Sequence, residues 1–278
     1  MKTVAIVGVG LIGGSFGLAL RKWGFAGEIL GISSQATIRA AIAVGAIDRS
    51  VLLEEAVQAD LIYLAQPIDG ILKTVEVLGP IAPSGCLITD AGSTKLAIVS
   101  QAALHVRHAH FLGGHPMAGK ESRGVQSAEA DLFADRPYVL TPLDFCQGAL
   151  EADLIYWLGQ MGAHVLTMTP ERHDAAVAWS SHLPQLLSTA LGYTLSRAAN
   201  PDVGLVAGPG LMDMTRLAMS SPDLWKSILA TNRGPILLAL ETLVEQLTGV
   251  KSLIQEDRLL SLWEESSTFA RNLRQTPT

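Results

Sequence analysis

The sequence predicts an α/β protein in which a Rossmann-type dinucleotide-binding domain is followed by an all-α dimerisation domain. The first observation is an apolar run that ends in a glycine-rich turn and continues as a helix, within residues 4–20. The second is the alternation of strand and helix patterns up to about residue 169, which is typical of a mostly parallel sheet. The third is that only helical patterns occur over residues 171–273. We therefore expect a nucleotide-binding domain over residues 1–169 and a helical substrate and dimerisation domain over residues 170–278.

The expected strands are apolar runs with β-branched residues, and glycine, proline or serine separates each strand from the next helix. These strands cover residues 2–8, 28–32, 61–65, 86–89, 110–113, 138–141 and 164–168. The helices between them cover residues 11–23, 35–44, 52–58, 69–78, 96–104 and 147–161. Polar turns follow the strands at residues 8–15, 33–35, 65–67, 90–95 and 113–119. Because the carboxyl ends of parallel strands lie at one edge of a sheet, these turns should converge on one cleft.

The first of these turns has the spacing of a dinucleotide site. Its three glycines occupy the G-x-G-x-x-G positions, which allow a tight turn, approach of a pyrophosphate and close packing of the helix on the strand. The N–H groups that open the new helix attract phosphate. An ordinary glycine-rich turn is the alternative, but the preceding strand and the following helix favour a dinucleotide site. The expected cofactor contacts in this turn are Gly8, Gly10, Leu11, Ile12 and Gly13.

The bulk composition excludes several classes of partner. A formal net charge of −6 argues against a nucleic-acid partner. Cys86 and Cys146 lack disulfide or zinc-ligand spacing, so we expect a reduced, cytoplasmic protein and no metal. No apolar stretch is long enough to cross a bilayer, and the first strand begins too close to Met1 for a signal peptide. We therefore expect no membrane partner.

Cofactor choice depends on the residues that follow the second expected strand. NAD-specific sites place an acidic residue there for the ribose 2′-hydroxyl, whereas this chain has Ser33, Ser34 and Gln35. Hydroxyls, backbone N–H groups and Arg39 one turn later can accept a 2′-phosphate. We therefore expect NADP, with NAD still possible because no arginine directly follows Ser33. The further expected cofactor contacts are Ser33, Ser34, Arg39, Ala65, Gln66, Pro67 and Ser93.

Two side chains at expected strand ends are candidates for chemistry. His115 precedes Pro116, so its backbone is extended, and a histidine in the cleft can exchange a proton with a substrate. A turn histidine bound to backbone groups is an equally good interpretation from the residues alone. Ser93 can cap the next helix, bind a substrate oxygen or the cofactor amide, or do both.

The helical domain offers further polar groups. Asp174 and Gln185 share one helical face with His182 beside it, while His173 and His182 fall on opposite faces and do not form a metal pair. Arg216 lies in a mostly apolar segment, where an arginine pairs with a buried carboxylate or binds an anionic ligand. Glu121 is the alternative internal partner for it. The three histidines His105, His108 and His110 are interpreted as solvated surface residues, since no further ligand has suitable spacing.

One helical stretch is more apolar than a single core face requires. The stripe and the side chains that widen it are Ile236, Leu237, Leu238, Leu240, Leu243, Val244, Leu247, Val250 and Ile254. A helix that is apolar on most sides is buried on most sides, which favours a homodimer over a central helix of one chain.

Taken together, these segments resemble the prephenate/arogenate dehydrogenases of tyrosine biosynthesis. The segments that carry the resemblance, in the order of the family, are residues 8–15, Thr89–Lys95, Gly113–Gly119, Ser181–Pro184 and Asp213–Arg216. The resemblance implies an oxidative decarboxylation of a cyclohexadienol, with His115 accepting the hydroxyl proton as hydride leaves for the nicotinamide. It implies that Ser93 binds the hydroxyl and places the nicotinamide, and that Arg216 holds a substrate carboxylate. It matches Glu121 to an acidic residue near the entrance and Asp174 to one on the second-domain helix.

Two departures from the family pattern bear on the substrate. Gln185 stands where prephenate-preferring members often carry a second histidine after Ser181–Pro184, and Met212 stands where relatives tend to carry a basic residue. Both departures remove positive charge near the substrate side chain. An ammonium group is repelled by a cation, so we expect arogenate, or dual use of arogenate and prephenate.

Two other functions compete with this interpretation. Another β-hydroxyacid dehydrogenase would need a lysine in the helical domain, and the first helix has none between Glu171 and Arg197. A non-catalytic NADP-binding regulator would bind the cofactor without turnover.

Overall fold

The computed structural model describes residues 1–120, 122–143 and 148–275. The chain divides into two compact units, the first formed by Met1–Val177 with Met219–Asn232 and the second by Ala178–Ala218 with Arg233–Thr278. The α/β class with a helical second part is confirmed. The single boundary near residue 169 stays a prediction, since by contacts the next helix groups with the first unit.

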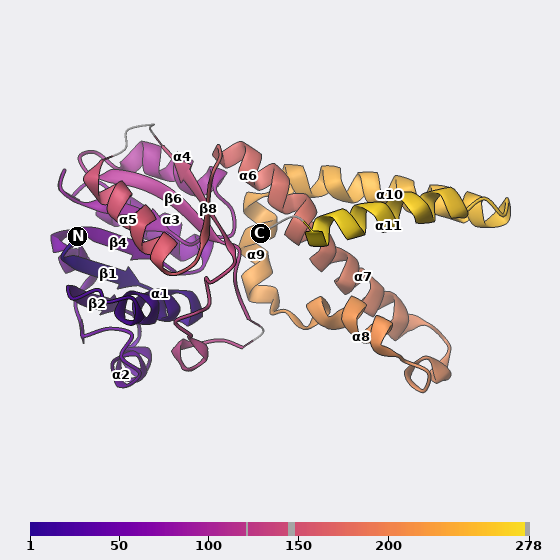
Figure 1. The fold of residues 1–278 in the computed structure, drawn as a ribbon, viewed down its shortest axis with the longest axis horizontal. Coiled ribbons are helices and arrows are strands. Elements are labelled where there is room, and N and C mark those ends of the chain that lie inside the picture. The colour runs from indigo at the N-terminus through magenta and orange to yellow at the C-terminus, as the bar shows by residue number, and fades with distance from the viewer. Residues whose placement is uncertain (121, 144–147, 276–278) are drawn as a thin grey trace. The chain divides into compact units, whose positions relative to one another are not determined.

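The first unit is built on an eight-stranded sheet with the order β3-β2-β1-β4-β5-β6-β7-β8 (Figure 1). The strands are β1 (Thr3–Val7), β2 (Glu28–Ile32), β3 (Arg49–Ser50), β4 (Leu61–Leu64), β5 (Leu87–Asp90), β6 (His110–Pro116), β7 (Pro137–Pro142) and β8 (His164–Thr167). All pairs are parallel except β6 with β7. The short strand β3 was not expected from the sequence.

Helices cover both faces of this sheet. They are α1 (Leu11–Lys22), α2 (Gln35–Ala43), η1 (Leu53–Gln58), α3 (Ile68–Leu78), α4 (Leu96–His105), η2 (Val125–Ser127), α5 (Ala149–Gln160), α6 (Pro170–Val177) and α9 (Pro222–Thr231). One buried core contains Phe16 of α1, stacked on Tyr63 of β4 with ring centroids 3.9 Å apart. A second core on the other face joins α3, α4 and Ile228 of α9. The alternation of strands and helices in the sequence is therefore confirmed.

Strand β6 is longer than the sequence indicates. It continues through His115 and Pro116, which pair with Val139 and Tyr138 of β7. The expectation that His115 follows the strand is wrong, because the antiparallel partner extends the ladder to Pro116. A proline at the end of a strand breaks no required ladder bond and keeps His115 extended.

The second unit is helical. Its elements are the π-helical turn η3 (Ala178–His182), α7 (Leu183–Arg197), η4 (Pro201–Gly204), α8 (Pro209–Thr215), η5 (Arg216–Met219, whose last residue groups with the first unit), α10 (Arg233–Gln255) and α11 (Leu260–Gln275). The π-helical turn ends two residues before Pro184, which has no N–H to donate within the helix. Prolines at positions 201 and 209 open the next two elements, where the missing N–H costs nothing.

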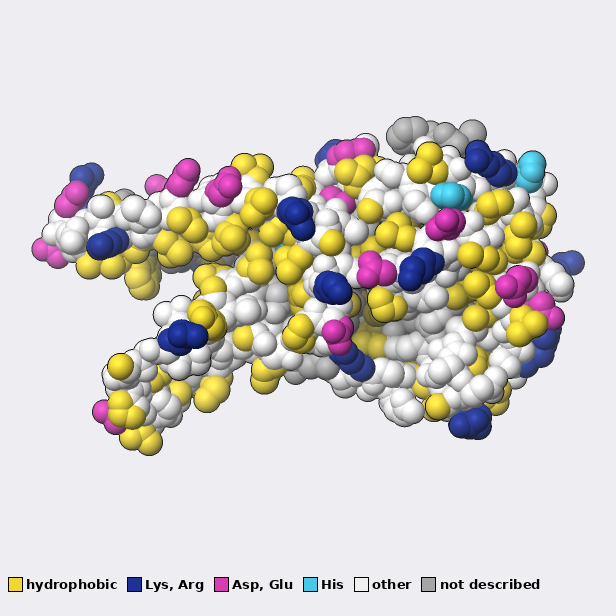
Figure 2. Space-filling view, turned by 180° about the vertical axis from the view of Figure 1, so that it is seen from behind, with side chains coloured by type: hydrophobic (Ala, Val, Ile, Leu, Met, Phe, Trp, Pro, Cys, Tyr) yellow, Lys and Arg dark blue, Asp and Glu magenta, His cyan; other side chains and the backbone are white. Residues whose placement is uncertain are grey.

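Helix α10 is less buried than its apolar pattern predicts. Among its residues only Ile236 and Ala239 are buried in the described chain. Exposed apolar side chains on α10 and α11 include Leu237, Leu238, Val244, Leu247, Ile254, Leu260, Trp263, Phe269 and Leu273. Hydrophobic side chains run along these two helices in Figure 2. A single chain thus leaves this apolar surface in water.

No helix in the described part of the chain is long and apolar enough to span a membrane. The cytoplasmic location expected from cysteine use stays a prediction.

Candidate active site

The glycine-rich turn has the geometry that a bound dinucleotide requires. Gly8 has φ +93°, and a Cβ there would lie 2.8 Å from the carbonyl carbon and oxygen of Ala65. A Cβ on Gly13 would lie 2.3 Å from the carbonyl oxygen of Gly8, so only glycine lets α1 approach β1 this closely. A Cβ on Gly10, in contrast, would meet nothing within 4 Å. No described side chain caps α1, and its first turn holds no acidic residue, so its N–H groups remain available to a phosphate.

A cavity of about 400 Å³ opens at the carboxyl ends of the strands. It is lined by Leu11, Ile12, Ala65–Ile68, Ala91–Ser93, His115, Pro116, Ala118–Lys120, Ser122–Gly124, Asp223 and Leu224. The turns expected to converge after β1, β4, β5 and β6 do meet here. Ser33 and Ser34, after β2, lie outside this lining and are exposed, as is Arg39. Ser34 caps α2 by accepting a hydrogen bond from the N–H of Thr37 at 3.3 Å.

His115 lies at the wall of this cavity and is only 9% exposed. Its Nδ1 is 2.8 Å from Nε2 of His173, and both rings are buried. Nδ1 of His173 is in turn 2.7 Å from a carboxylate oxygen of Asp174. The three side chains therefore form one buried hydrogen-bonded chain that ends at the cavity.

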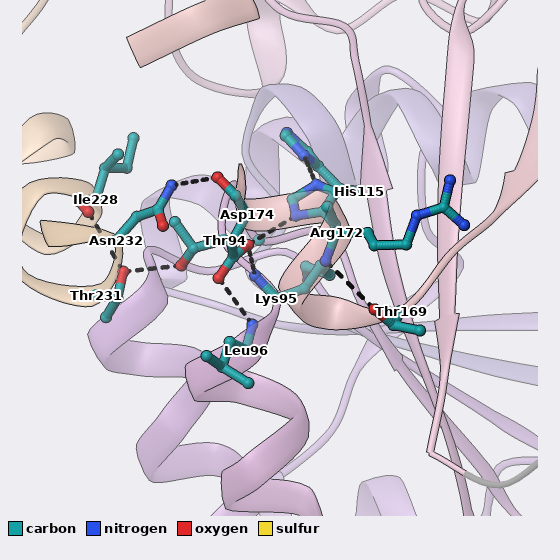
Figure 3. Close-up of polar contacts among 12 residues, drawn as sticks. Thr94, Lys95, Leu96, His115, Thr169, Arg172, Asp174, Ile228, Thr231 and Asn232 are labelled. Carbon is teal, nitrogen blue, oxygen red and sulfur yellow. Dashed lines mark hydrogen bonds and ion pairs between the residues drawn. The ribbon is translucent and has the colours of Figure 1, made fainter. Parts of the chain in front are cut away.

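Asp174 links this chain to the start of α4 (Figure 3). Its carboxylate accepts the backbone N–H groups of Lys95 at 2.7 Å and Leu96 at 3.0 Å. Its backbone carbonyl accepts a hydrogen bond from Nδ2 of Asn232 at 2.8 Å. Asp174 therefore caps α4 from a distant part of the sequence. Its side chain is buried and does not line the cavity, so a direct contact with the substrate is not the role that its position supports.

Ser93 lies in the turn between β5 and α4, two residues before the helix cap. The cap position is Lys95, which makes no side-chain cap bond, so Ser93 is not the helix cap that was one of its interpretations. Ser93 is partly exposed and lines the cavity. The turn around it is held on both sides, by Asp174 at the start of α4 and by Asp90 at the end of β5.

The Asp90 carboxylate is buried together with the Lys95 ammonium, with which it forms an ion pair. It also accepts the N–H groups of Gly92 at 2.8 Å and Gly114 at 3.1 Å. Burial lowers the pKa of Lys95, and Asp90 opposes that effect by favouring the charged form. Gly114 directly precedes His115, so one carboxylate fixes both the Ser93 turn and the strand that carries His115.

The second unit holds the other expected substrate contacts. His182 is buried in the π-helical turn, and Gln185 is buried on α7. Nε2 of Gln185 donates to the carbonyl oxygen of Leu217 at 2.7 Å, and Oγ of Ser188 accepts the N–H of Ala218 at 3.0 Å. These bonds tie α7 to the segment that begins with the exposed residue Arg216. Glu121, the alternative partner of Arg216, lies outside the described residues.

His173 is the residue that the sequence analysis missed. The spacing of His173 and His182 on an ideal helix excludes a metal pair, and the sequence assigns His173 no other role. The signal available in the sequence was the adjacent pair His173-Asp174, since a carboxylate beside a histidine commonly orients its ring. Among the described residues no group of three or more histidine, cysteine, aspartate or glutamate side chains is arranged to hold a metal ion.

These observations define a class of protein. A glycine turn with an uncapped helix start, a cavity at the ends of parallel strands and a buried histidine at its wall are typical of dinucleotide-dependent oxidoreductases.

Comparisons with known proteins define the family. The family described as "Prephenate dehydrogenase, nucleotide-binding domain" matches residues 16–167, and "Prephenate dehydrogenase, dimerization domain" matches residues 169–267. A prephenate dehydrogenase of Bacillus subtilis is 32% identical over 277 residues, covering 96% of this chain and 74% of that protein. A crystal structure of prephenate dehydrogenase from A. aeolicus in complex with hydroxyphenyl propionate and NAD+ has a TM-score of 0.90 at 30% identity, covering 98% of both chains. A crystal structure of Synechocystis arogenate dehydrogenase has a TM-score of 0.83 at 31% identity, covering 99% of both chains.

The chain therefore belongs to the prephenate dehydrogenase family. It is an NAD(P)-dependent oxidoreductase of tyrosine biosynthesis that oxidatively decarboxylates prephenate, arogenate or both.

The glycine geometry gives a matched pair of variants. We expect Gly13→Ala to lower the free energy of unfolding by about 1–3 kcal/mol, because its Cβ meets a backbone oxygen that cannot move away. We expect Gly10→Ala to cost less than about 1 kcal/mol, as an alanine at a helix cap does. Gly10 occupies the position of the motif at which the backbone approaches a pyrophosphate, so the added Cβ should lower cofactor affinity by about tenfold, or 1.4 kcal/mol. Denaturant unfolding measures the stability of each variant, and fluorescence titration measures its cofactor affinity. Equal losses of stability in the two variants would contradict the assignment of a packing role to Gly13 and a cofactor role to Gly10.

Proposed function

We propose that this enzyme prefers NADP and arogenate, accepts prephenate as a second substrate, and uses His115 as the proton acceptor. The observation that carries the catalytic role is the position of His115, at the cavity wall beside the Ser93 turn and bound on its Nδ1 side to a buried histidine. The fit of the glycine turn to a dinucleotide supports the cofactor site. When bound there, the nicotinamide supplies the chemistry of hydride acceptance.

The chain's own residues supply the remaining steps. His115 accepts the proton of the ring hydroxyl at Nε2, while the carbon that bears the hydroxyl loses its hydride. The ring carboxylate then leaves as carbon dioxide, and its bonding electrons complete the aromatic ring as a phenolate. The imidazolium of His115 returns its proton to the phenolate oxygen, which gives the phenol and restores the base. Ser93 donates a hydrogen bond to the hydroxyl oxygen and so fixes its distance from His115. The pyrophosphate is held by the glycine turn of Gly8, Gly10 and Gly13 and by the N–H groups of Leu11 and Ile12.

We assign substrate recognition to the second unit, as the family resemblance implies. Arg216 holds a carboxylate of the substrate through its planar pair of donors. His182 and Gln185 contact the substrate near Arg216, and Glu121 acts near the entrance. We propose that Asp174 supports the site by holding the start of α4 and does not contact the substrate.

The preference for arogenate rests on Gln185 and Met212. The described bonds of Gln185 use its amide nitrogen, which donates to Leu217 and, at 3.3 Å, to Oγ1 of Thr189. The carbonyl oxygen is then the group that this side chain can offer, and it accepts a hydrogen bond from an ammonium but not from a ketone. Met212 is 61% exposed and brings no charge. An amino acid side chain therefore suits this environment better than a keto acid.

The proposed activity is tested by measuring turnover with arogenate and with prephenate, each with NADP and with NAD. Reduced cofactor and carbon dioxide should appear together, with the highest kcat/KM for arogenate and NADP. The absence of turnover with both substrates would overturn the proposal, and would favour a cofactor-binding regulator. A higher kcat/KM for prephenate would overturn only the substrate preference.

The control for this assay is His115→Asn, which keeps a polar side chain of similar width but cannot accept the proton. Turnover should fall at least about a hundredfold, the usual contribution of a general base. The dissociation constant of NADP should change by less than about twofold. A loss of cofactor binding equal to the loss of turnover would argue against the proton-accepting role.

Cofactor preference is tested by Ser33→Asp at the end of β2. The new carboxylate can bind a ribose 2′-hydroxyl and repels a 2′-phosphate, so the ratio of kcat/KM for NADP to that for NAD should fall at least about tenfold. Ser100→Asp places the same charge on an exposed position of α4 and should leave the ratio unchanged. An unchanged ratio in Ser33→Asp would contradict the proposed 2′-phosphate site.

We also propose a homodimer in which a second copy covers the apolar surface of α10 and α11. Light scattering should give twice the 29.5 kDa of one chain. Leu247→Glu places a charge on this surface at a residue that is 53% exposed in one chain, and should shift the mass toward the monomer. Leu104→Glu, at a 62% exposed position on α4, is the matched control and should leave the dimer intact. A monomeric wild type would overturn this proposal.

A further inference from the structure

The chain of buried side chains behind His115 carries an inference that rests on the proposed function and deepens it. We propose that His173, oriented by Asp174, is a positioning residue that holds the proton on Nδ1 of His115 and so leaves Nε2 of His115 unprotonated, as the acceptor for the substrate hydroxyl.

The surroundings of Asp174 favour its ionised form. Its carboxylate already accepts two backbone N–H groups at the start of α4, where the positive end of the helix dipole favours negative charge. An ionised carboxylate only accepts hydrogen bonds. The proton in its 2.7 Å contact with His173 therefore belongs to Nδ1 of His173.

The two imidazole rings share one hydrogen bond, and the protonation of His173 sets its direction. A neutral imidazole carries one donor and one acceptor nitrogen, so Nε2 of His173 is an acceptor once Nδ1 holds the proton. The 2.8 Å contact between the rings then requires the proton to sit on Nδ1 of His115. His115 is thereby held in the tautomer whose Nε2 has a lone pair.

His115 becomes positively charged during the reaction, and the chain behind it stabilises that charge. When Nε2 takes the hydroxyl proton, Nδ1 keeps its own proton. The hydrogen bond from Nδ1 to His173 then becomes stronger, because the ring of His115 is positively charged. His173 passes the polarisation to Asp174 without giving up a proton. The arrangement follows the logic of the buried carboxylate–histidine pair in serine hydrolases, with a second imidazole between carboxylate and base.

Among the residues that the structure describes, the other charged groups near the rings do not compete with Asp174 for His173. Lys95 and Asp90 are fully buried and paired with each other. Tyr138 of β7 is buried, and its pKa is raised well above the usual value by burial, so it is uncharged. Glu171 and Arg172 on α6 and Asp223 on α9 are exposed to solvent. Asp174 is thus the buried carboxylate that contacts His173.

The test compares His173→Leu with His173→Gln. Leucine fills the space but cannot accept a hydrogen bond from Nδ1 of His115. We expect kcat to fall about 10–100-fold, as for other residues that orient a functional histidine, with KM values and the NADP dissociation constant within about twofold. The acid limb of the pH–rate profile should move to lower pH, because the imidazolium of His115 loses its stabilising partner. The Gln side chain offers a carbonyl oxygen in place of Nε2 and should restore most of kcat.

Two controls separate a positioning role from a structural one. His108→Leu removes an exposed histidine of the same domain and should change neither kcat nor the pH profile. Thermal unfolding of each variant measures stability independently of the rate.

A second measurement does not depend on turnover. In protein labelled with ¹⁵N in its seven histidines, the signals of His115 are assigned from the spectrum of His115→Asn. When the ring of His115 is neutral, its ¹⁵N shifts should show a proton on Nδ1 and none on Nε2. A proton on Nε2 of His115, or a His173→Leu enzyme with wild-type kcat and pH profile, would overturn the inference. Absence of turnover in the wild type with the expected tautomer would overturn the proposed reaction instead.

Discussion

The buried carboxylate of Asp174 is the interaction on which the site depends. It is buried, and removing a charge from water is costly unless hydrogen bonds replace the hydration. Three donors do so, the N–H groups of Lys95 and Leu96 and the ring of His173. Satisfying this one group therefore fixes the start of α4, the position of α6 and the orientation of a histidine ring at the same time.

A second buried carboxylate, Asp90, completes this frame from the other side of the turn. Its ion pair with Lys95 carries a desolvation cost, which the backbone N–H groups of Gly92 and Gly114 help to offset. Because Lys95 contributes its ammonium to Asp90 and its backbone N–H to Asp174, the two carboxylates are connected through one residue. Movement of the Ser93 turn would therefore strain the hydrogen bonds of both carboxylates. Such support keeps a functional turn rigid without placing a charge in the cavity.

The parts of this structure that could be predicted are those set by local pattern. The glycine turn, the alternating strands and helices and the meeting of strand ends follow from periodicity and from the rules of parallel sheets. The parts that could not are set by distant pairing. Strand β6 reaches Pro116 because β7 lies beside it, and Ser93 is not a cap because Asp174, about eighty residues later, takes that role. The placement of His173 and His182 on opposite faces holds for a regular helix, whereas the π-helical turn Ala178–His182 has a different angle per residue.

The division of the chain into two units separates two kinds of residue. The hydrogen-bonded chain of His115, His173 and Asp174 lies wholly in the first unit together with the cavity and the glycine turn. Gln185 and Arg216, assigned to recognition, belong to the second unit and are joined there through the hydrogen bond to Leu217. Under the proposed assignment, replacing Gln185 or Met212 with a charged residue would change the charge near the substrate side chain without touching any bond between His115, His173 and Asp174. Substrate preference within this fold can therefore change while the acid–base chemistry stays the same.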